Sequence, residues 1–220
     1  MPAPHADPPH PLARLLTDAM AGRFPPVDGG WQRVEPWLPG VEAVVALTGH
    51  AVLCIGDDVP DDELEQLGVD GYGGAHHPAV ALLLAGGGHV DVLDVLLVAP
   101  GTGAGPGPLV PRDDLADHPR ALHALQVRAD VQVWGPASGS APVLLSRGIG
   151  GLPELSLELP PDATGGGRGR DLVRAARGLV ADGEPMVACV APGNARSLRA
   201  FLAAGFVPVG SVQLVVPERD

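Results

Sequence analysis

The segment APGNARSLRAFLAAGFVPVG, residues 191–210, decides the fold prediction. An Asn follows a Pro-Gly turn, and the next residues have the apolar period of a short helix over 194–204, which would bury Leu198, Phe201 and Leu202. A glycine ends this pattern, and the apolar residues after it are typical of a strand. We therefore expect a short helix between two strands, with the Asn where the first strand ends.

The residues before this segment extend the pattern. PMVACVAP, residues 185–192, is typical of a buried strand, and an amphipathic helix is predicted over 170–181. PELSLELP, residues 153–160, alternates cleanly and predicts a strand over 154–159. The leucines share one face of it and the polar residues the other: Leu155, Leu157 and Leu159 opposite Glu154, Ser156 and Glu158.

TGGGRGRD, residues 164–171, joins that strand to the helix at 170. A glycine-rich loop that opens a helix can bind an anion, because backbone N–H groups point outward and glycine lets a phosphate approach. A plain flexible turn in a chain with 31 glycines is the alternative. Six of the 14 basic residues lie nearby and favour an anionic ligand: Arg168, Arg170, Arg174, Arg177, Arg196 and Arg199.

The order strand, strand, strand, glycine loop, helix, VACVAPGN strand, helix, AAGF, strand resembles the GNAT superfamily of acyl-CoA-dependent N-acetyltransferases over about residues 111–216. The resemblance implies an α/β (α+β) fold with a mixed, mostly antiparallel sheet flanked by helices. It also implies acetyl-CoA as co-substrate. In that family the fourth and fifth strands splay apart, and the pantetheine arm enters the gap.

By this resemblance, Leu157 and Leu159 bind the cofactor through their main chains, and an N–H near Glu158 or Leu159 polarises the thioester carbonyl. Asn194 bonds the pantetheine or the nearby backbone, or is a plain helix N-cap. The full set of expected cofactor contacts is Leu157, Leu159, Thr164, Gly165, Gly166, Gly167, Arg168, Gly169, Arg170, Asn194, Ser197 and Phe201.

Two positions depart from the family pattern. Thr164 stands where the family has Gln or Arg, and Arg168 or Arg170 is expected to compensate. Phe201 stands where the family often has the Tyr that protonates the thiolate, and phenylalanine has no proton to donate. Ser197, Cys189 or water would have to replace it.

Amine acetylation needs a general base and donors for the tetrahedral oxyanion. Glu154 and Glu158 are the candidate bases, and Ser197 completes the candidate catalytic set. For each glutamate the alternative is the solvated face of an antiparallel strand.

We therefore expect an N-acetyltransferase that acts on a primary amine of a small molecule or peptide. A catalytically weak or inactive acyl-CoA-binding module is the first alternative. A structural half of a larger assembly without coenzyme A is the second. A homodimer is expected because family members are often dimers.

Composition narrows the partners. The net charge of −12 argues against nucleic acid as a partner. The histidines at 76–77, 118 and 123 lack partners at metal-ligand spacing, so surface histidines and no metal are expected. The start of the sequence is unlike a signal peptide and apolar runs are short, which predicts a cytoplasmic protein without a membrane partner. Cys54 and Cys189 are expected to be buried free thiols.

Three segments are predicted along the chain. Residues 1–30 form a lead with a helix over 11–22. Residues 31–110 form an extra α/β portion, expected to be a degenerate half of the same fold that walls the acceptor site. It includes a hairpin that turns near Thr48. Residues 111–220 form the acetyl-CoA-binding core, which begins with a helix to about Val127 capped by Asp113 or Asp114.

Overall fold

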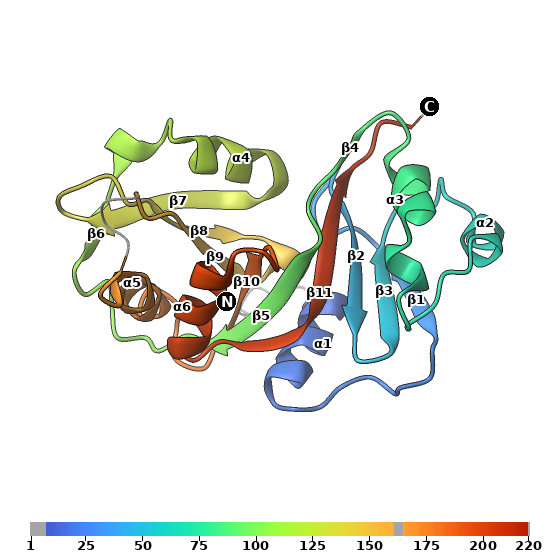
Figure 1. The fold of residues 1–220 in the computed structure, drawn as a ribbon, viewed down its shortest axis with the longest axis horizontal. Coiled ribbons are helices and arrows are strands. Elements are labelled where there is room, and N and C mark those ends of the chain that lie inside the picture. Colours follow the sequence, from blue (N-terminus) through green and yellow to red (C-terminus); the bar gives the residue numbers. More distant parts are fainter. Residues whose placement is uncertain (1–7, 161–164, 220) are drawn as a thin grey trace, which may run out of the picture.

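The computed structural model describes residues 8–160 and 165–219 (Figure 1). The described residues form six α-helices: α1 Pro11–Met20, α2 Asp61–Gln66, α3 Pro78–Ala85, α4 Pro119–Val127, α5 Arg168–Arg177 and α6 Ala195–Ala203. Short 3-10 helices cover Gly74–His76, Asp113–Leu115 and Ile149–Gly151. The strands are β1 Trp31–Val34, β2 Glu42–Leu47, β3 His50–Cys54, β4 His89–Val90, β5 Asp94–Pro100, β6 Leu109–Pro111, β7 Ala129–Pro136, β8 Val143–Arg147, β9 Pro153–Leu157, β10 Pro185–Val190 and β11 Val207–Val216.

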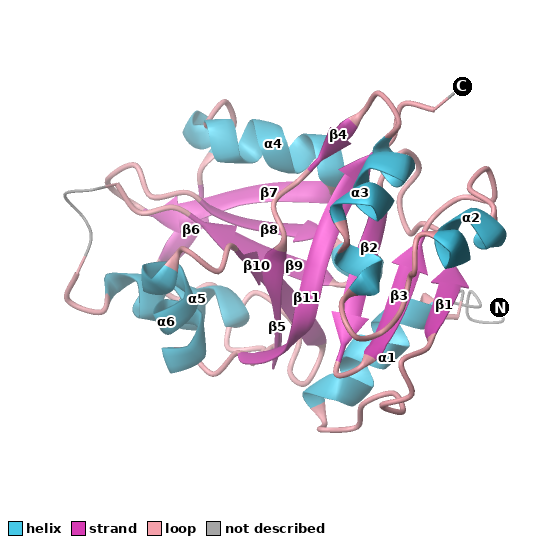
Figure 2. Ribbon diagram, turned by 45° about the vertical axis from the view of Figure 1, so that its right-hand side comes forward, coloured by secondary structure: helices cyan, strands magenta, loops and turns pink. Residues whose placement is uncertain are grey.

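All of these strands belong to one open sheet, in the order β1-β3-β2-β11-β5-β10-β9-β8-β7-β6, with β4 beside β11. Neighbouring strands are antiparallel except for β1 with β3 and β9 with β10. The chain is therefore a mixed α/β protein with a large, mostly antiparallel sheet and helices on both faces, as Figure 2 shows. This confirms the coarse fold class expected from the sequence.

The two parts of the chain share the middle of this sheet. β5 comes from the first part but lies between β10 and β11 of the second, and β11 pairs on its other side with β2. Figure 1 shows the green β5 and the red β11 side by side there. The division near residue 110 stays a prediction, because the sheet crosses it without interruption.

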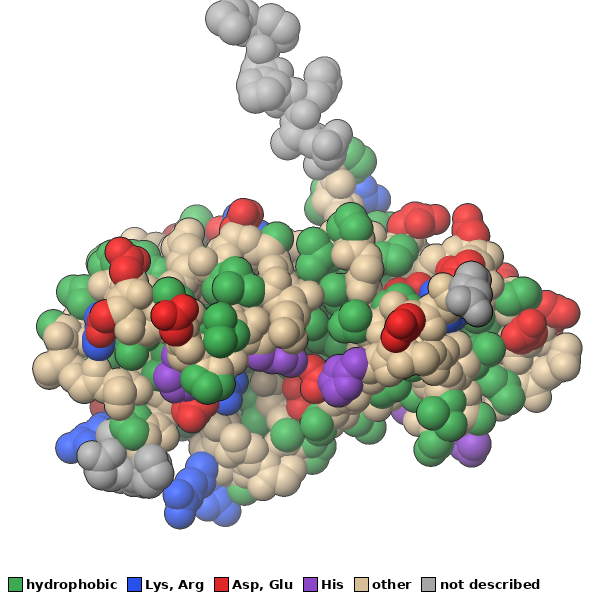
Figure 3. Space-filling view, turned by 90° about the horizontal axis from the view of Figure 1, so that it is seen from above, with side chains coloured by type: hydrophobic (Ala, Val, Ile, Leu, Met, Phe, Trp, Pro, Cys, Tyr) green, Lys and Arg blue, Asp and Glu red, His purple; other side chains and the backbone are tan. Residues whose placement is uncertain are grey.

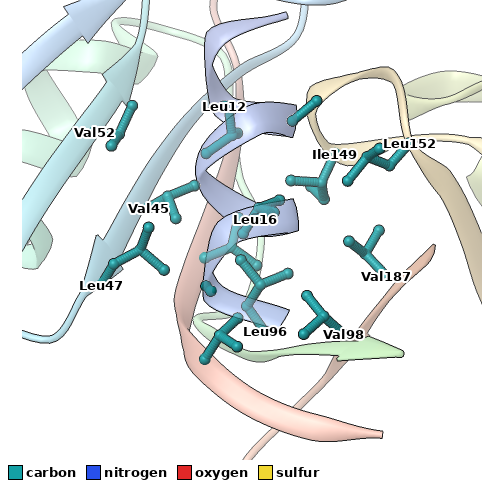
Figure 4. Packing of buried hydrophobic residues seen from close by; sticks show 14 of the residues in the cluster. Leu12, Leu16, Val45, Leu47, Val52, Leu96, Val98, Ile149, Leu152 and Val187 are labelled. Carbon is teal, nitrogen blue, oxygen red and sulfur yellow. The ribbon is translucent and has the colours of Figure 1, made fainter. Parts of the chain in front are cut away.

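Helix α1 covers the centre of one sheet face, called here the α1 face. Its leucines pack between Val45 of the first part and Val187 of the second (Figure 4). Leu12 and Leu16 are fully buried in this cluster, as the apolar spacing of residues 11–20 requires.

Helix α4 lies on the α1 face too, because it packs on Leu144, whose register partner Ser156 is on the same face as Glu154 and Val187. Helices α5 and α6 cover the opposite face of β5, β9 and β10.

One predicted helix start is wrong. Asp113 and Asp114 lie in a 3-10 turn, and α4 begins at Pro119 with His118 as its N-cap, whose Nδ1 accepts from the N–H of Arg120 at 3.2 Å. Asp114 is instead held by Arg112 at 2.7 Å. Proline favours the first helical position, because it has no N–H to leave unpaired there. His10-Pro11 and His77-Pro78 begin α1 and α3 in the same way.

Candidate functional site

Strands β9 and β10 diverge at the centre of the sheet. Their parallel pairing has a single register pair, Glu154 with Val187, whereas β8 and β9 pair along the whole of β9. Beyond Glu154 the two strands therefore leave a gap between their carboxyl ends.

The backbone of β9 faces this gap at alternate residues. The N–H of Glu158 donates to the carbonyl of Pro142 at 3.0 Å, in register with the β8 pairing. Hydrogen-bonded and non-bonded pairs alternate in an antiparallel ladder, so Leu157 opposite Val143 directs its N–H and C=O away from β8. The sequence predicted that the N–H of Glu158 or Leu159 lies near the thioester. The N–H of Glu158 is already bonded to Pro142, whereas that of Leu159 is directed away from β8, by the same alternation as Leu157.

The glycine loop leads from this gap to α5. Gly165, Gly166 and Gly167 have φ values of +101°, +59° and +82°, and Gly167 is the N-cap with no side-chain bond to the first turn. Among the described residues, a Cβ at Gly165 or Gly166 would meet nothing within 4 Å, so no described residue fills the space beside the loop. Thr164 lies outside the described residues.

Gly169 has a packing role. A Cβ there would lie 3.3 Å from Leu159 Cδ1 and 3.4 Å from the Cβ of Ala200. The start of α5, the end of β9 and α6 therefore meet at this glycine, which positions the loop next to the gap.

Four of the six arginines in the expected patch divide into two groups, whereas Arg196 and Arg199 are exposed on α6. Arg174 and Arg177 donate to the last carbonyls of α6, at 2.9 and 2.6 Å, and so hold the fold together. Arg170 lies over Gly167 and pairs with Asp171 at 2.8 Å. Exposed Arg168 lines a cavity of about 500 Å³ with Leu159, Pro160, Leu172 and the β7–β8 turn. Only the second group faces the open space beside the loop.

The residues of α6 have structural partners. Asn194 is an N-cap whose Oδ1 accepts from the N–H of Ser197 at 3.1 Å, which confirms its interpretation as a helix N-cap. Phe201 is 4% exposed and packs edge-to-face on Phe206 with 5.0 Å between ring centroids. An aromatic hydrocarbon suits this core position, because it has no hydroxyl that would need a partner there.

The polar side of β9 is buried. Glu154 is 1% exposed and Ser156 6%, so the alternative of a solvated strand face is wrong for Glu154. Arg128 at the end of α4 lies 2.6 Å from Glu154 Oε1 and donates to Ser156 Oγ at 3.1 Å. The other carboxylate oxygen accepts from the N–H of Ile149 at 3.2 Å.

Glu154 is therefore held in place by its surroundings. A Cβ at Gly148 would lie 1.8 Å from its Oε2, so only glycine leaves room for it. Glu158, on the same face, is half exposed and pairs with Arg120 of α4 at 3.2 Å.

Three further polar groups lie on this face, and two of them, Asp91 and Asp94, were missed in the sequence. Asp94 begins β5, Asp91 precedes it and lies 3.4 Å from His123 of α4, and Cys189 of β10 is opposite Leu96. The sequence signal was a charged residue at the head of the apolar run DVLLVAP, but that run was assigned to the other part of the chain. Figure 3, which views the molecule from above, shows histidine, acidic and basic side chains close together along the middle of that surface.

The pKa values on this face reflect burial. Burial, followed by the charges of Asp91 and Glu154, raises the pKa of Asp94 to about 6 against the opposing effect of Arg128 and Arg120. Burial, with Glu154 next in size, raises the pKa of the half-buried Cys189, so it stays a thiol at neutral pH. Cys54 is buried, and both cysteines are free.

Over residues 8–160 and 165–219, no cluster of three or more His, Cys, Asp or Glu has the geometry to hold a metal ion. No helix in this part of the chain is long and apolar enough to cross a membrane. No protein-family model matches the chain, and no curated protein matches it.

Proposed function

We propose that this protein is a GNAT-like N-acetyltransferase that transfers an acetyl group from acetyl-CoA to a primary amine. The observation that carries the proposal is the gap between β9 and β10, with the backbone of Leu157 directed into it and the open glycine loop next to it. The family resemblance stated above requires this combination of a splayed strand pair and a phosphate loop.

The residues present fit acetyl-CoA. Its pyrophosphate would lie against Gly165 to Gly167 and the first turn of α5, where Arg168, Arg170 and N–H groups that no described side chain caps supply positive charge. Its pantetheine arm would pair with Leu157 and Leu159 in the gap. The bound thioester supplies the electrophilic carbonyl carbon.

The chain's own groups would polarise the thioester carbonyl and orient the acceptor amine. An N–H of Leu157 or Leu159 would stabilise the oxyanion. Glu154 would hold Arg128, which donates to Ser156, beside the acceptor, because its carboxylate is already engaged by Arg128 and Ile149. Glu158 is accessible enough to contact an incoming amine.

A catalytically weak acyl-CoA-binding module is the second candidate. Buried Phe201 favours it, because no hydroxyl stands at that position to protonate the departing thiolate. Ser197, half-buried on the same helix, would be the replacement donor in an active enzyme. For either candidate we propose a cytoplasmic location and a homodimer, and for the enzyme a small-molecule or peptide acceptor.

The first prediction concerns Gly166. Its φ of +59° is one that Asp and Asn tolerate, and a Cβ there would meet none of the described residues within 4 Å. Gly166→Asp places a negative charge next to the pyrophosphate, whereas Gly166→Asn has the same shape without the charge. We expect calorimetric titration to give micromolar acetyl-CoA binding for the wild type, and Asp to weaken it about tenfold or more relative to Asn.

Equal binding by the Asp and Asn variants would mean that the phosphates lie elsewhere. Absence of wild-type binding would reject both candidates. If acetyl-CoA binds, release of free thiol from acetyl-CoA in the presence of primary amines separates the enzyme from the binding module.

A further inference from the structure

Asp94 stands at the open end of the gap. It is the first residue of β5, one position before Val95, which pairs with Val190 at the end of β10. β10 is the strand that diverges from β9, so the carboxyl end of β10 borders the place where the acetyl group would lie.

The side chain of Asp94 is on the same sheet face as Glu154. Directly opposite residues of paired strands share a face, so Leu96 shares it with Cys189, and Val187 shares it with Glu154. Side chains alternate along a strand, which puts Asp94 with Leu96 and Cys189 with Val187. Asp94 and Glu154 therefore point to the same face of the sheet, the α1 face, which α4 also covers.

The other charged groups around Asp94 have partners. Asp91 pairs with His123, Glu154 pairs with Arg128, and Glu158 pairs with Arg120. Asp94, by contrast, has no ion-pair partner among residues 8–160 and 165–219. A half-buried carboxylate without a counter-ion, at the mouth of an acyl site, is available for a cationic ligand or a proton.

We propose that Asp94, contributed by the first part of the chain, is the general base of the transfer and the group that binds the acceptor's ammonium. This inference rests on the proposed function. The ammonium gives one proton to the Asp94 carboxylate, and the freed nitrogen lone pair forms a bond to the thioester carbonyl carbon. The C–S bond breaks with its electrons going to sulfur, which takes the second nitrogen proton and leaves as the free thiol of coenzyme A.

The chemistry of Asp94 suits this role better than that of the two glutamates. A general base works best when its pKa lies near the working pH, and the pKa of Asp94 is raised to about 6 by burial and by Asp91 and Glu154. Glu154 would have to give up Arg128 and Ile149 to move, and Glu158 would have to give up Arg120.

The second prediction is that Asp94→Asn leaves acetyl-CoA affinity unchanged by calorimetry but lowers kcat/KM for the amine by about 100-fold or more. The substrates are acetyl-CoA with putrescine, spermidine, tyramine or a lysine-containing tripeptide, followed by thiol release. The acid limb of the wild-type pH profile, with a midpoint near pH 6, disappears in the variant. Asp91→Asn keeps the limb but moves its midpoint to lower pH, because one of the charges that raise the pKa of Asp94 is gone.

Several outcomes would overturn this assignment. One is a wild type that binds acetyl-CoA and turns over while Asp94→Asn keeps its rate and its acid limb; the proposed function then survives and only Asp94 is wrong. If none of the amines reacts, the same comparison is made on hydrolysis of acetyl-CoA, in which water loses its proton to the same base. Binding without transfer or hydrolysis contradicts any base at this position, and absence of binding contradicts the proposed function itself.

Discussion

At the scale of single residues, Asp94 shows how a site can work against stability. Its pKa is raised to about 6 in the folded protein from an ordinary value of 3.8, which means that folding opposes its ionisation. Well below pH 3.8 the carboxyl is protonated in both states and has no effect. As the pH rises from below 3.8 to about 6, the Asp94 carboxyl ionises first in the unfolded state, so the folded state is destabilised.

The third prediction follows from the direction of this pH effect on stability. Asp94→Asn should have a higher melting temperature than the wild type at pH 7.5, because the buried charge is gone. The difference should shrink as the pH falls from 6 and vanish only well below pH 3.8. Thermal unfolding at a series of pH values measures it, and such a gain in stability with a loss of activity is typical of catalytic residues.

Asp114→Asn is the control with the opposite sign. The hydrogen bond from Arg112 lowers the pKa of Asp114, so its ionised form stabilises the folded protein and that contribution is lost as the pH falls. This variant should melt below the wild type at pH 7.5 and approach it in acid. If both variants respond to pH in the same direction, the assigned environment of Asp94 is wrong.

At the scale of elements, the sequence predicted the regular structure well. The hairpin of β2 and β3, strand β9 and the helix between β10 and β11 follow from apolar period and glycine stops, which are local signals. The start of α4 was wrong because a His-Pro dipeptide capped it in place of an aspartate. That signal is local as well and occurs three times in the chain.

Long-range neighbours were not predictable in this way. No local pattern says that β5 inserts between β10 and β11, or that Arg128 turns back from α4 to Glu154. The buried polar face of the site depends on both. The glycine loop and α6 could therefore be named from the sequence, whereas Asp94 and the burial of Glu154 could not.

The fourth prediction concerns the joint of α5 and α6. The half-buried Arg177 of α5 donates to the carbonyls of Ala204 and Pro100, at 2.6 and 3.0 Å, and so ties the end of α6 to β5. A cation at the C-terminus of a helix, as Arg177 is for α6, also interacts favourably with the helix dipole. Arg177→Gln should reduce the free energy of unfolding by about 2 kcal/mol, measured by urea titration.

Arg174→Gln is the matched control on the same helix. Arg174 is exposed and donates only to the carbonyl of Ala203, at 2.9 Å. Its replacement should cost less than half as much as that of Arg177. Equal losses would mean that the contact with β5 contributes nothing.

At the scale of the whole molecule, the end of the chain is fastened across the sheet. Arg219, three residues beyond β11, reaches Glu42 at the start of β2 at 2.5 Å and Asp58 at 2.7 Å. It also donates to the carbonyl of Leu84 in α3. Glu42 is only 4% exposed, so a strand of the first part has a buried carboxylate whose countercharge comes from the second.

The fifth prediction is that Arg219→Gln destabilises the protein by about 3 kcal/mol, because removal of one partner leaves the Glu42 charge buried. Glu42→Gln in the same chain should restore part of this loss, which a double-mutant cycle by urea unfolding detects. Arg23→Gln is the control: its pair with Asp18 has the same 2.5 Å separation, but the side chains are 66% and 50% exposed. Solvent screens such a pair, so its loss should stay below about 1 kcal/mol. A loss at Arg219 no larger than at Arg23 would mean that the two parts of the chain are held together by the shared strands alone.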